Sequence, residues 1–562
     1  MTAAWTLTVA MMFLYVAWYG RNMPYWEDWG LVPVLTGAQP FSLDWLTQQV
    51  LEHRFVLSRA MLYPIWWLSG GDFRGAMFVN AALLAAVAWM CVQTARKLRG
   101  RASYFDAFFP MALLNLGHHE SLIFFVQLYF VLPVVLFLVA VAIIARDSWM
   151  RSGRIATCLG LCIAALPLNG GIGMMLAPPL LVWALVAAWV RRRERAASIP
   201  LALAALLALI EIGLYFVNYH APAIGTQARS VLAISRAALE VVSVTFGPAA
   251  AAAFPLSGLF TAALLLTGSL FLTATVLRNR FERIRALGLL MALAGIALVV
   301  LGIGFGRSVL GAQAGFSGRY ALLVVPGLIV VFLASVRYLD TTFGRLLPVL
   351  LFSAACAMLG LNAHSALDYA AYRDKIADGV ANAIRSGASP AAVAREYAGT
   401  VTSNTDPNVV PALRSLQRMN WGPYRSDASA TSANWVNCRE TDLPLHISDS
   451  HEMNFDGKWT TATGNDPSMV LDLPTSLSVC GVRIRYEIAN DDQSSATMQV
   501  FWGDTTTSKY FSGITRNHMF SVSPGMHETT IWIYDTIDRL RIDPDTRPCR
   551  FKLDSVTLLG GG

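Results

Sequence analysis

The sequence predicts a polytopic α-helical membrane protein with a C-terminal all-β domain. The chain has 562 residues, of which 55% are hydrophobic and only 14% are charged. Its mean hydropathy of +0.49 exceeds that of soluble globular proteins. Apolar stretches of about 17 to 25 residues, the length of a helix that crosses a bilayer, recur until about residue 363. Beyond that point the composition is that of a soluble domain.

About eleven segments are apolar and long enough to be membrane helices. They cover residues 4–20, 76–95, 104–117, 122–145, 154–168, 172–190, 199–218, 255–277, 286–305, 320–336 and 344–362. Basic clusters such as residues 96–101 and 191–195 fall on alternate connections, and lysine and arginine mark cytoplasmic loops. We therefore expect a cytoplasmic N-terminus, a multi-pass chain in the bacterial inner (cytoplasmic) membrane and a periplasmic C-terminal domain.

The sequence suggests three regions. Residues 1–363 form the membrane domain, and residues 364–434 show helical periodicity, which predicts a periplasmic helical connector. Residues 435–562 contain short alternating strands, for example residues 482–488 and 529–534, separated by Asn, Asp, Gly and Ser turns. This pattern predicts a periplasmic β-sandwich of jelly-roll type.

Three of the seven cysteines lie in the C-terminal region: Cys438, Cys480 and Cys549. Two of them can pair if that region is periplasmic. The predicted disulfide joins Cys438 to Cys549, because this bond would tie the two ends of the domain together. Cys438 with Cys480 is the alternative.

Two adjacent carboxylates, Glu27 and Asp28, follow the first apolar segment between Trp26 and Trp29. Charged groups are costly in hydrocarbon and tryptophan is common at membrane interfaces, so we expect this motif at the outer surface. A carboxylate can act as a general base toward a hydroxyl group. The alternative interpretation is a solvated loop with an aromatic belt.

Further charged residues are expected on the same side of the membrane. Arg319 is the first candidate for binding a phosphate, with Arg54 and Arg307 as supports, because arginine binds phosphate through paired, charge-assisted hydrogen bonds. The alternative for Arg319 is contact with lipid headgroups. The other residues on this side include Glu52, His53, His118, His119, Glu120 and Tyr320.

Two patterns suggest binding sites only weakly. Adjacent histidines at His118 and His119 point in different directions, and no second cluster has metal-ligand spacing. The identity of any bound metal is therefore unknown. Asn169, Gly170 and Gly171 follow no strand, so a tight turn between helices is favoured over a phosphate-binding loop.

The membrane half contains five short motifs in a fixed order. In chain order they are residues 26–29, residues 52–54, Glu120 followed by Gln127, residues 169–171 and residues 318–320. With this order of motifs, the membrane half resembles the GT-C class of polyprenyl-phosphate-sugar-dependent glycosyltransferases, and within it bacterial arabinofuranosyltransferase-like proteins. The C-terminal strand at residues 540–544 is similar to sugar-binding jelly rolls appended to such enzymes.

The resemblance implies an inverting glycosyltransferase in which Glu27 or Asp28 is the general base. The other carboxylate is expected to orient the acceptor or coordinate a divalent cation, Mg²⁺ or Mn²⁺; no cofactor is certain. The implied donor-phosphate ligands are Arg319, Arg54, Arg307, Tyr320 and His53. The implied acceptor or substrate contacts are Glu120, His118, His119, Trp26 and Trp29.

The implied partners are a polyprenyl-phosphate-linked sugar and a glycan, glycolipid or glycoprotein acceptor. The net charge of +7 comes largely from the inner loops, so it favours membrane lipids as a partner and requires no nucleic acid. Two alternatives remain for function. One is a polymerase or ligase of lipid-linked glycans, and the other is a transporter or flippase of lipid-linked sugars.

Overall fold

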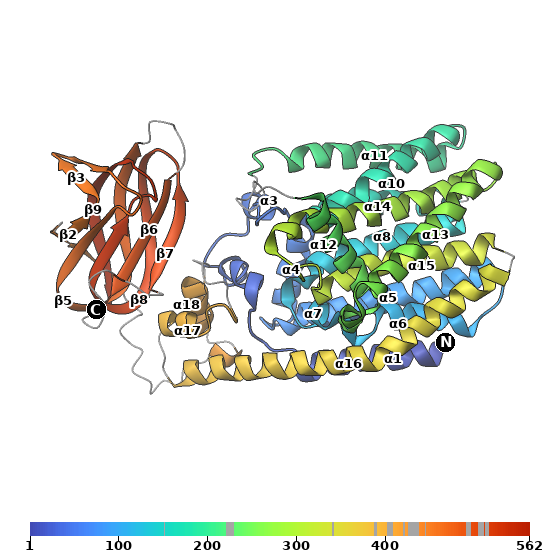
Figure 1. Ribbon diagram of the computed structural model, residues 1–562, viewed down its shortest axis with the longest axis horizontal. Helices are drawn as coiled ribbons and strands as arrows, with labels where there is room; N and C mark the ends of the chain where they lie inside the picture. The colour runs from blue at the N-terminus through green and yellow to red at the C-terminus, as the bar shows by residue number, and fades with distance from the viewer. Residues whose placement is uncertain are drawn as a thin grey trace. The chain divides into compact units, whose positions relative to one another are not determined.

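The computed structural model describes the chain in two compact units (Figure 1). The first unit comprises Met1–Asn22 and Phe41–Asp374, and the second comprises Met23–Pro40 and Lys375–Gly562. The short segment with the acidic motif thus belongs to the unit that contains the β-domain. The described residues are 1–562 apart from residues 151, 221–229, 340–341, 387–389, 402–408, 420–421, 425–437, 444–445, 490–495, 504–510, 512–515 and 562.

The first unit is built from apolar helices, which confirms the prediction of a multi-pass membrane protein. Among the described residues, nine helical segments are long and apolar enough to cross a membrane. They are Thr2–Tyr19, Arg74–Arg99, Phe125–Arg146, Gly170–Val190, Arg195–Tyr215, Leu256–Arg278, Arg283–Leu310, Gly318–Tyr338 and Gly344–Arg385. Each corresponds to one of the predicted spans. The direction in which the chain crosses the membrane stays a prediction.

Two of the predicted spans are shorter than a membrane-crossing helix. Residues 154–168 form α9 (Gly153–Ala165), with 13 residues. Residues 104–117 contain α6 (Phe108–Leu113), with 6 residues, between two 3-10 turns. The side chain of Asn115 accounts for the end of α6, because its Nδ2 donates to the carbonyls of Met111 and Ala112 while its Oδ1 accepts from the Gly117 amide. Such side-chain bonds compete with helix continuation.

The centre of the helical unit is α15 (Ala321–Tyr338), in which every residue from Ala321 to Ser335 is buried. It packs against α5 (Arg74–Arg99), α8 (Leu128–Arg146), α13 (Leu256–Arg278) and α14 (Arg283–Arg307). A helix that is apolar on all sides is expected in the interior of a bundle. By contrast, α11 (Arg195–Tyr215) and α13 (Leu256–Arg278) expose large side chains such as Leu203 and Leu270, which suits contact with lipid.

The remaining helices of the chain lie in both units. In the first unit they include α1 (Thr2–Tyr19), α3 (Leu43–Thr47), α4 (Val56–Leu68), α5 (Arg74–Arg99), α7 (His119–Leu122), α8 (Leu128–Arg146), α10 (Gly170–Val190), α12 (Val231–Ser243) and α14 (Arg283–Arg307). The second unit contains α2 (Val32–Leu35), α17 (Pro390–Glu396) and α18 (Val409–Met419). The last predicted span continues without a break into the predicted connector as α16 (Thr342–Arg385), a helix of 44 residues.

The C-terminal domain is an antiparallel sheet, which confirms the prediction of a β-domain. Its described strands have the order β3-β4-β9-β5-β8-β6-β7, with β1 paired to β9 and β2 paired to β5. Their bounds are β1 Cys438–Leu443, β2 Ile447–His451, β3 Met453–Asp456, β4 Trp459–Ala462, β5 Ser468–Ala489, β6 Ala496–Gly503, β7 Asn517–Val522, β8 Gly525–Asp543 and β9 Arg550–Gly561.

The long strands β5 and β8 organise the core of this domain. Their register shifts between Asp472 and Leu477 and again between Val479 and Gly481, and such bulges bend a sheet. Leu471, Val482 and Val500 come from different parts of the bent sheet but share one buried apolar cluster. The described strands form one continuous sheet, and a jelly-roll topology stays a prediction. The predicted start of the domain, at residues 434–435, lies outside the described residues.

The predicted disulfide between Cys438 and Cys549 is wrong. Cys549 is a free, buried thiol, whereas Cys480 is disulfide-bonded. The register gives the physical reason: Cys438 pairs with Gly561 at the end of β9, while Cys549 precedes the start of β9 at Arg550. At about 3.3 Å per residue, the length of β9 separates these two cysteines by far more than the roughly 7 Å that a disulfide allows. The side chain of Cys438 lies outside the described residues.

Candidate functional site

The acidic motif forms a 3-10 turn, η1 (Trp26–Gly30), that gives its two carboxylates different environments. Asp28 is completely buried. Its Oδ2 accepts from the Tyr25 amide at 3.0 Å, and its own amide donates to the Tyr25 carbonyl at 3.1 Å. Glu27, the neighbouring residue, is exposed. Asp28 therefore stabilises the turn, and Glu27 is the carboxylate that a substrate can reach.

The turn is held in a strained conformation. Trp26 has a φ of +49°, which is rare for a bulky residue. Its amide donates to the Val401 carbonyl at 2.8 Å, and the Nε1 of Trp29 donates to the same oxygen at 3.1 Å. Trp29 is 1% exposed, while Trp26 is 38% exposed. Strained backbone persists where surrounding contacts fix it, often next to functional groups.

Tyr424 lies beside the buried carboxylate. Burial raises the pKa of Tyr424 well above its usual value, and the charge of Asp28 raises it further. The phenol therefore stays neutral at physiological pH. Tyr424 was not a candidate at the level of sequence, because nearly four hundred positions separate it from Asp28; its place after the breaker residues Gly422 and Pro423 is the only local signal.

In the helical unit, His53 lies within electrostatic range of two candidate arginines. Burial lowers its pKa, the charges of Arg307 and Arg319 lower it further, and Glu52 opposes them. The Gly171 amide donates to His53 Nδ1 at 3.2 Å, so the neutral ring carries its proton on Nε2. That nitrogen lies 3.6 Å from Glu52 Oε1. His53 is thus a neutral hydrogen-bond donor beside the carboxylate of Glu52.

A glycine turn makes room for this histidine. A turn between α9 and α10 is confirmed, but it ends at Asn169; Gly170, with a φ of +69°, and Gly171 begin α10. A methyl group at Gly171 would lie 2.7 Å from His53 Cε1, and one at Gly170 would lie 2.4 Å from the ring of Phe55. Asn169 stabilises the turn, because its Oδ1 accepts from the hydroxyl of Ser58 at 2.8 Å.

The carboxylate of Glu120 fixes the start of the helix that carries Arg319. It accepts from the Ser317 hydroxyl at 3.1 Å, the Gly318 amide at 3.2 Å and the Arg319 amide at 3.2 Å. Anionic groups are favoured at helix N-termini, where backbone amides lack partners. Glu120 was expected to contact the acceptor; these bonds give it the role of a cap for the Gly318-Arg319-Tyr320 motif.

The arginines are oriented by aromatic neighbours. Arg307 Nε donates to the hydroxyl of Tyr320 at 2.8 Å, and Tyr320 is only 4% exposed. Tyr320 therefore positions Arg307. The guanidinium carbon of Arg319 lies 5.5 Å from the ring centroid of Phe130, a cation–π distance.

Arg54 is held at the end of α11. Its guanidinium donates to the carbonyls of Val217 at 2.7 Å and Asn218 at 3.1 Å. Nearby, the hydroxyl of Tyr215 donates to the Glu52 carbonyl at 2.7 Å. These bonds tie the loop of His53 to α11, so Arg54 acts here as a structural anchor.

His118 and His119, which were expected to contact the acceptor, are buried among helices. His118 Nε2 donates to the Ala112 carbonyl at 2.8 Å, and burial lowers its pKa to about 4. The ring of His119 lies 4.7 Å from that of Tyr369, and burial lowers the pKa of His119 despite the opposing charge of Glu120. In the described part of the chain, no group of three or more His, Cys, Asp or Glu side chains could hold a metal ion.

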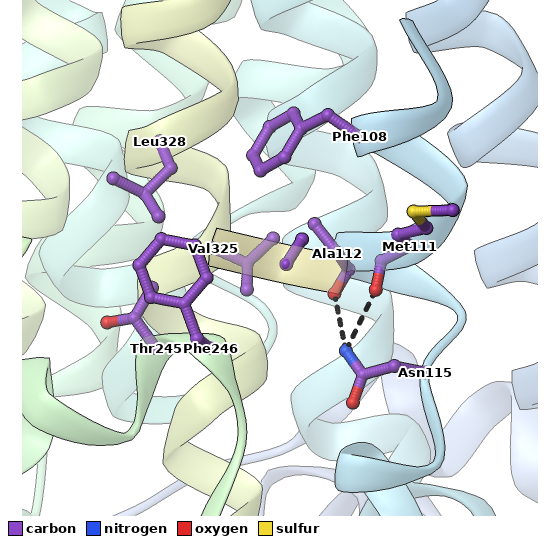
Figure 2. A pocket seen from close by; sticks show the side chains of 9 residues that line it. Phe108, Met111, Ala112, Asn115, Thr245, Phe246, Val325 and Leu328 are labelled. Carbon is purple, nitrogen blue, oxygen red and sulfur yellow. Dashed lines mark hydrogen bonds between the residues drawn. The ribbon is translucent and has the colours of Figure 1, made fainter. Parts of the chain in front are cut away.

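A small cavity lies inside the helical unit near Asn115 (Figure 2). Its volume is about 10 Å³, roughly the space of one water molecule, and most of its lining residues are apolar. Asn115 turns its amide toward the backbone of α6, as the dashed lines of Figure 2 show. The amide of Asn362, which does not line the cavity, donates to the Phe246 carbonyl at 2.7 Å. The described lining includes no arginine or histidine, so the cavity is separate from the donor candidates.

Comparisons with known proteins find likeness only among solved structures. No protein-family model matches the chain, and no curated protein matches it. Four chains of solved structures match. One is the cryo-EM structure of the arabinosyltransferase EmbB from Mycobacterium smegmatis, with 11% sequence identity and a TM-score of 0.27. The match covers 100% of this chain and 64% of the EmbB chain.

Proposed function

We propose that the protein is a membrane glycosyltransferase that moves a sugar from a polyprenyl phosphate to a hydroxyl of a glycan, glycolipid or protein acceptor. The observation that carries the proposal is the exposed Glu27 next to the buried Asp28 on a strained turn. The motif order of the sequence, which resembles GT-C enzymes, supports the same function. The expected location is the bacterial inner membrane, with the chemistry on its outer face.

Glu27 is the proposed general base. Its carboxylate takes the proton of the acceptor hydroxyl, and the hydroxyl oxygen attacks the anomeric carbon of the donor sugar from the face opposite the phosphate. The bond from the anomeric carbon to the phosphate oxygen breaks, and the phosphate leaves with the electron pair. The sugar is transferred with inversion. Asp28 holds Glu27 in place and takes no part in proton transfer.

Arg319 and Arg307 are the proposed ligands of the leaving phosphate. The phosphate gains one negative charge when the glycosidic bond breaks, and guanidinium groups stabilise such charge through paired hydrogen bonds. The Nε2–H group of neutral His53 donates a hydrogen bond to a phosphate oxygen. Glu120 and Tyr320 act through the arginines: Glu120 positions Arg319, and Tyr320 positions Arg307.

A divalent cation does not fit the acidic motif well. The buried Asp28 directs Oδ2 to the Tyr25 amide, and the described residues offer no third acidic or histidine ligand arranged for a metal. No step of the proposed reaction therefore runs through a metal ion.

The test is transfer from a polyprenyl-phosphate-linked sugar by the purified full-length protein. We expect Glu27→Gln to lower the transfer rate by about 10² to 10⁴, the usual contribution of a general base. Asp28→Asn should mainly lower the thermal midpoint, because it weakens the bond to Tyr25. Full transfer activity of Glu27→Gln would refute the proposed base.

A further inference from the structure

The helix α18 connects the acidic turn to the β-domain within the second unit. Its buried side includes Val409, Leu413 and Leu416. It packs against η1 and α2 and also against β8. The acidic turn is about 380 positions from α18 in the sequence, so this contact is a product of the tertiary fold.

Residues on both sides of α18 hold the acidic turn. Val401, which precedes the helix, accepts from the Trp26 amide and from Trp29 Nε1. Tyr424, which follows the helix, lies beside the buried Asp28. α18 itself packs against η1, so a shift of α18 would disturb the turn that presents Glu27.

One buried arginine anchors α18 to the β-domain. Arg414 is 7% exposed; its Nη1 donates to the hydroxyl of Tyr534, and its guanidinium carbon lies 4.5 Å from the centroid of the same ring. Tyr534 is 3% exposed and has a φ of +46°, at the point where β8 shifts its register against β5. Val410 also packs against the buried cluster of Cys480, Tyr534 and Leu559.

We infer that Arg414 is a positioning residue for Glu27. Arg414 fixes α18 on the bulge of β8, and α18 with Val401 and Tyr424 fixes the strained turn. This inference rests on the proposed function and adds to it that the β-domain supports the general base, independently of any glycan that the domain binds.

The experiment compares Arg414→Met and Arg414→Lys with a matched control, Arg541→Met, in the full-length protein. Arg541 is a partly buried arginine of β8, the strand that also carries Tyr534. It pairs with Asp466 and Asp543, and its guanidinium carbon lies 5.2 Å from the ring centroid of Phe501. The readouts are hydrogen exchange of the amides of residues 26–31, and kcat and KM for transfer.

We expect Arg414→Met to speed exchange of the Trp26 amide at least tenfold and to lower kcat about tenfold while the donor KM stays constant. Arg414→Lys should restore part of both effects, because a lysine keeps a charged donor. Arg541→Met should lower the thermal midpoint and leave exchange of residues 26–31 and kcat as in the wild type. If Arg414→Met yields little folded protein, Tyr534→Phe, which removes only the accepting hydroxyl, should raise the exchange of residues 26–31 in the same direction.

Two results separate this inference from the proposed function. If Arg414→Met speeds exchange of residues 26–31 but Glu27→Gln keeps full transfer, Arg414 positions the acidic turn but the proposed function is wrong. If Glu27→Gln abolishes transfer but Arg414→Met changes neither exchange nor kcat beyond the Arg541→Met control, the positioning role of Arg414 is overturned.

Discussion

Substitution of Gly171 by alanine tests whether the position of His53 matters for donor binding. A methyl group at Gly171 would lie 2.7 Å from His53 Cε1 and 2.8 Å from Nδ1. Optimal contacts between carbon atoms begin at roughly 3.5 Å, so the imidazole would have to move by roughly 0.8 Å. The bond from the Gly171 amide to Nδ1, now 3.2 Å long, would be lost or lengthened.

The expected effect on transfer follows from this displacement. A misplacement of about 1 Å can cost about 10²-fold in rate, so Gly171→Ala should lower kcat/KM for the donor by roughly 10- to 100-fold. The fold itself should tolerate the change, because alanine is favoured over glycine in a helix by about 1 kcal/mol and α10 begins at Gly170.

The assay is transfer from the lipid-linked sugar, with the thermal midpoint measured in parallel. Gly213→Ala is the matched control, because Gly213 also lies in an apolar helix and has no atom within 4 Å of the added methyl group. The control should keep wild-type activity. A wild-type kcat/KM in Gly171→Ala would show that the position of the His53 ring does not affect use of the donor, and would refute the reasoning.

Two further predictions concern buried polar groups. The folded chain holds the pKa of His118 at about 4 against 6.5 for the free side chain, so below pH 6.5 the unfolded chain takes up a proton that the folded chain takes up only near pH 4. The free energy of unfolding should therefore fall by roughly 3 kcal/mol as the pH falls from 6.5 to about 4. His118→Gln should flatten this pH dependence in detergent unfolding titrations. An unchanged slope of the unfolding free energy against pH would contradict the prediction. Glu120→Gln should lower stability by about 1 to 2 kcal/mol and raise the donor KM, because the start of the Arg319 helix loosens. Glu240→Gln changes a buried carboxylate that accepts from the turn amides of Gln313 and Gly315, and it should lower stability without changing the donor KM.

The helical and sheet regions could be predicted because their signals are local. A membrane helix requires only a long apolar run, and a strand requires only short-range alternation. The same rules missed where a span breaks. The predicted span at residues 104–117 ends early because Asn115 bonds to the backbone of α6, and a mean hydropathy over a window does not register one such side chain.

The candidate site was predicted by residue type but not by role. The sequence marked Glu27 and Asp28 as a pair, and the structure separates them by burial. It likewise marked Glu120 as a substrate contact, whereas its carboxylate caps a helix 198 positions further along the chain. Adjacent residues point in different directions, and the partners that decide their exposure are distant in sequence.

By itself, the sequence determined a helical membrane unit, a C-terminal β-domain and an acidic motif after the first span. Only the tertiary structure decided that this motif belongs to the same unit as the β-domain, that Asp28 is buried while Glu27 is exposed, and that Cys549 is a free thiol. The physical reason is the range of the interactions. Hydropathy and alternation act between near neighbours, while burial, helix caps and disulfide geometry depend on chain segments that meet only after folding.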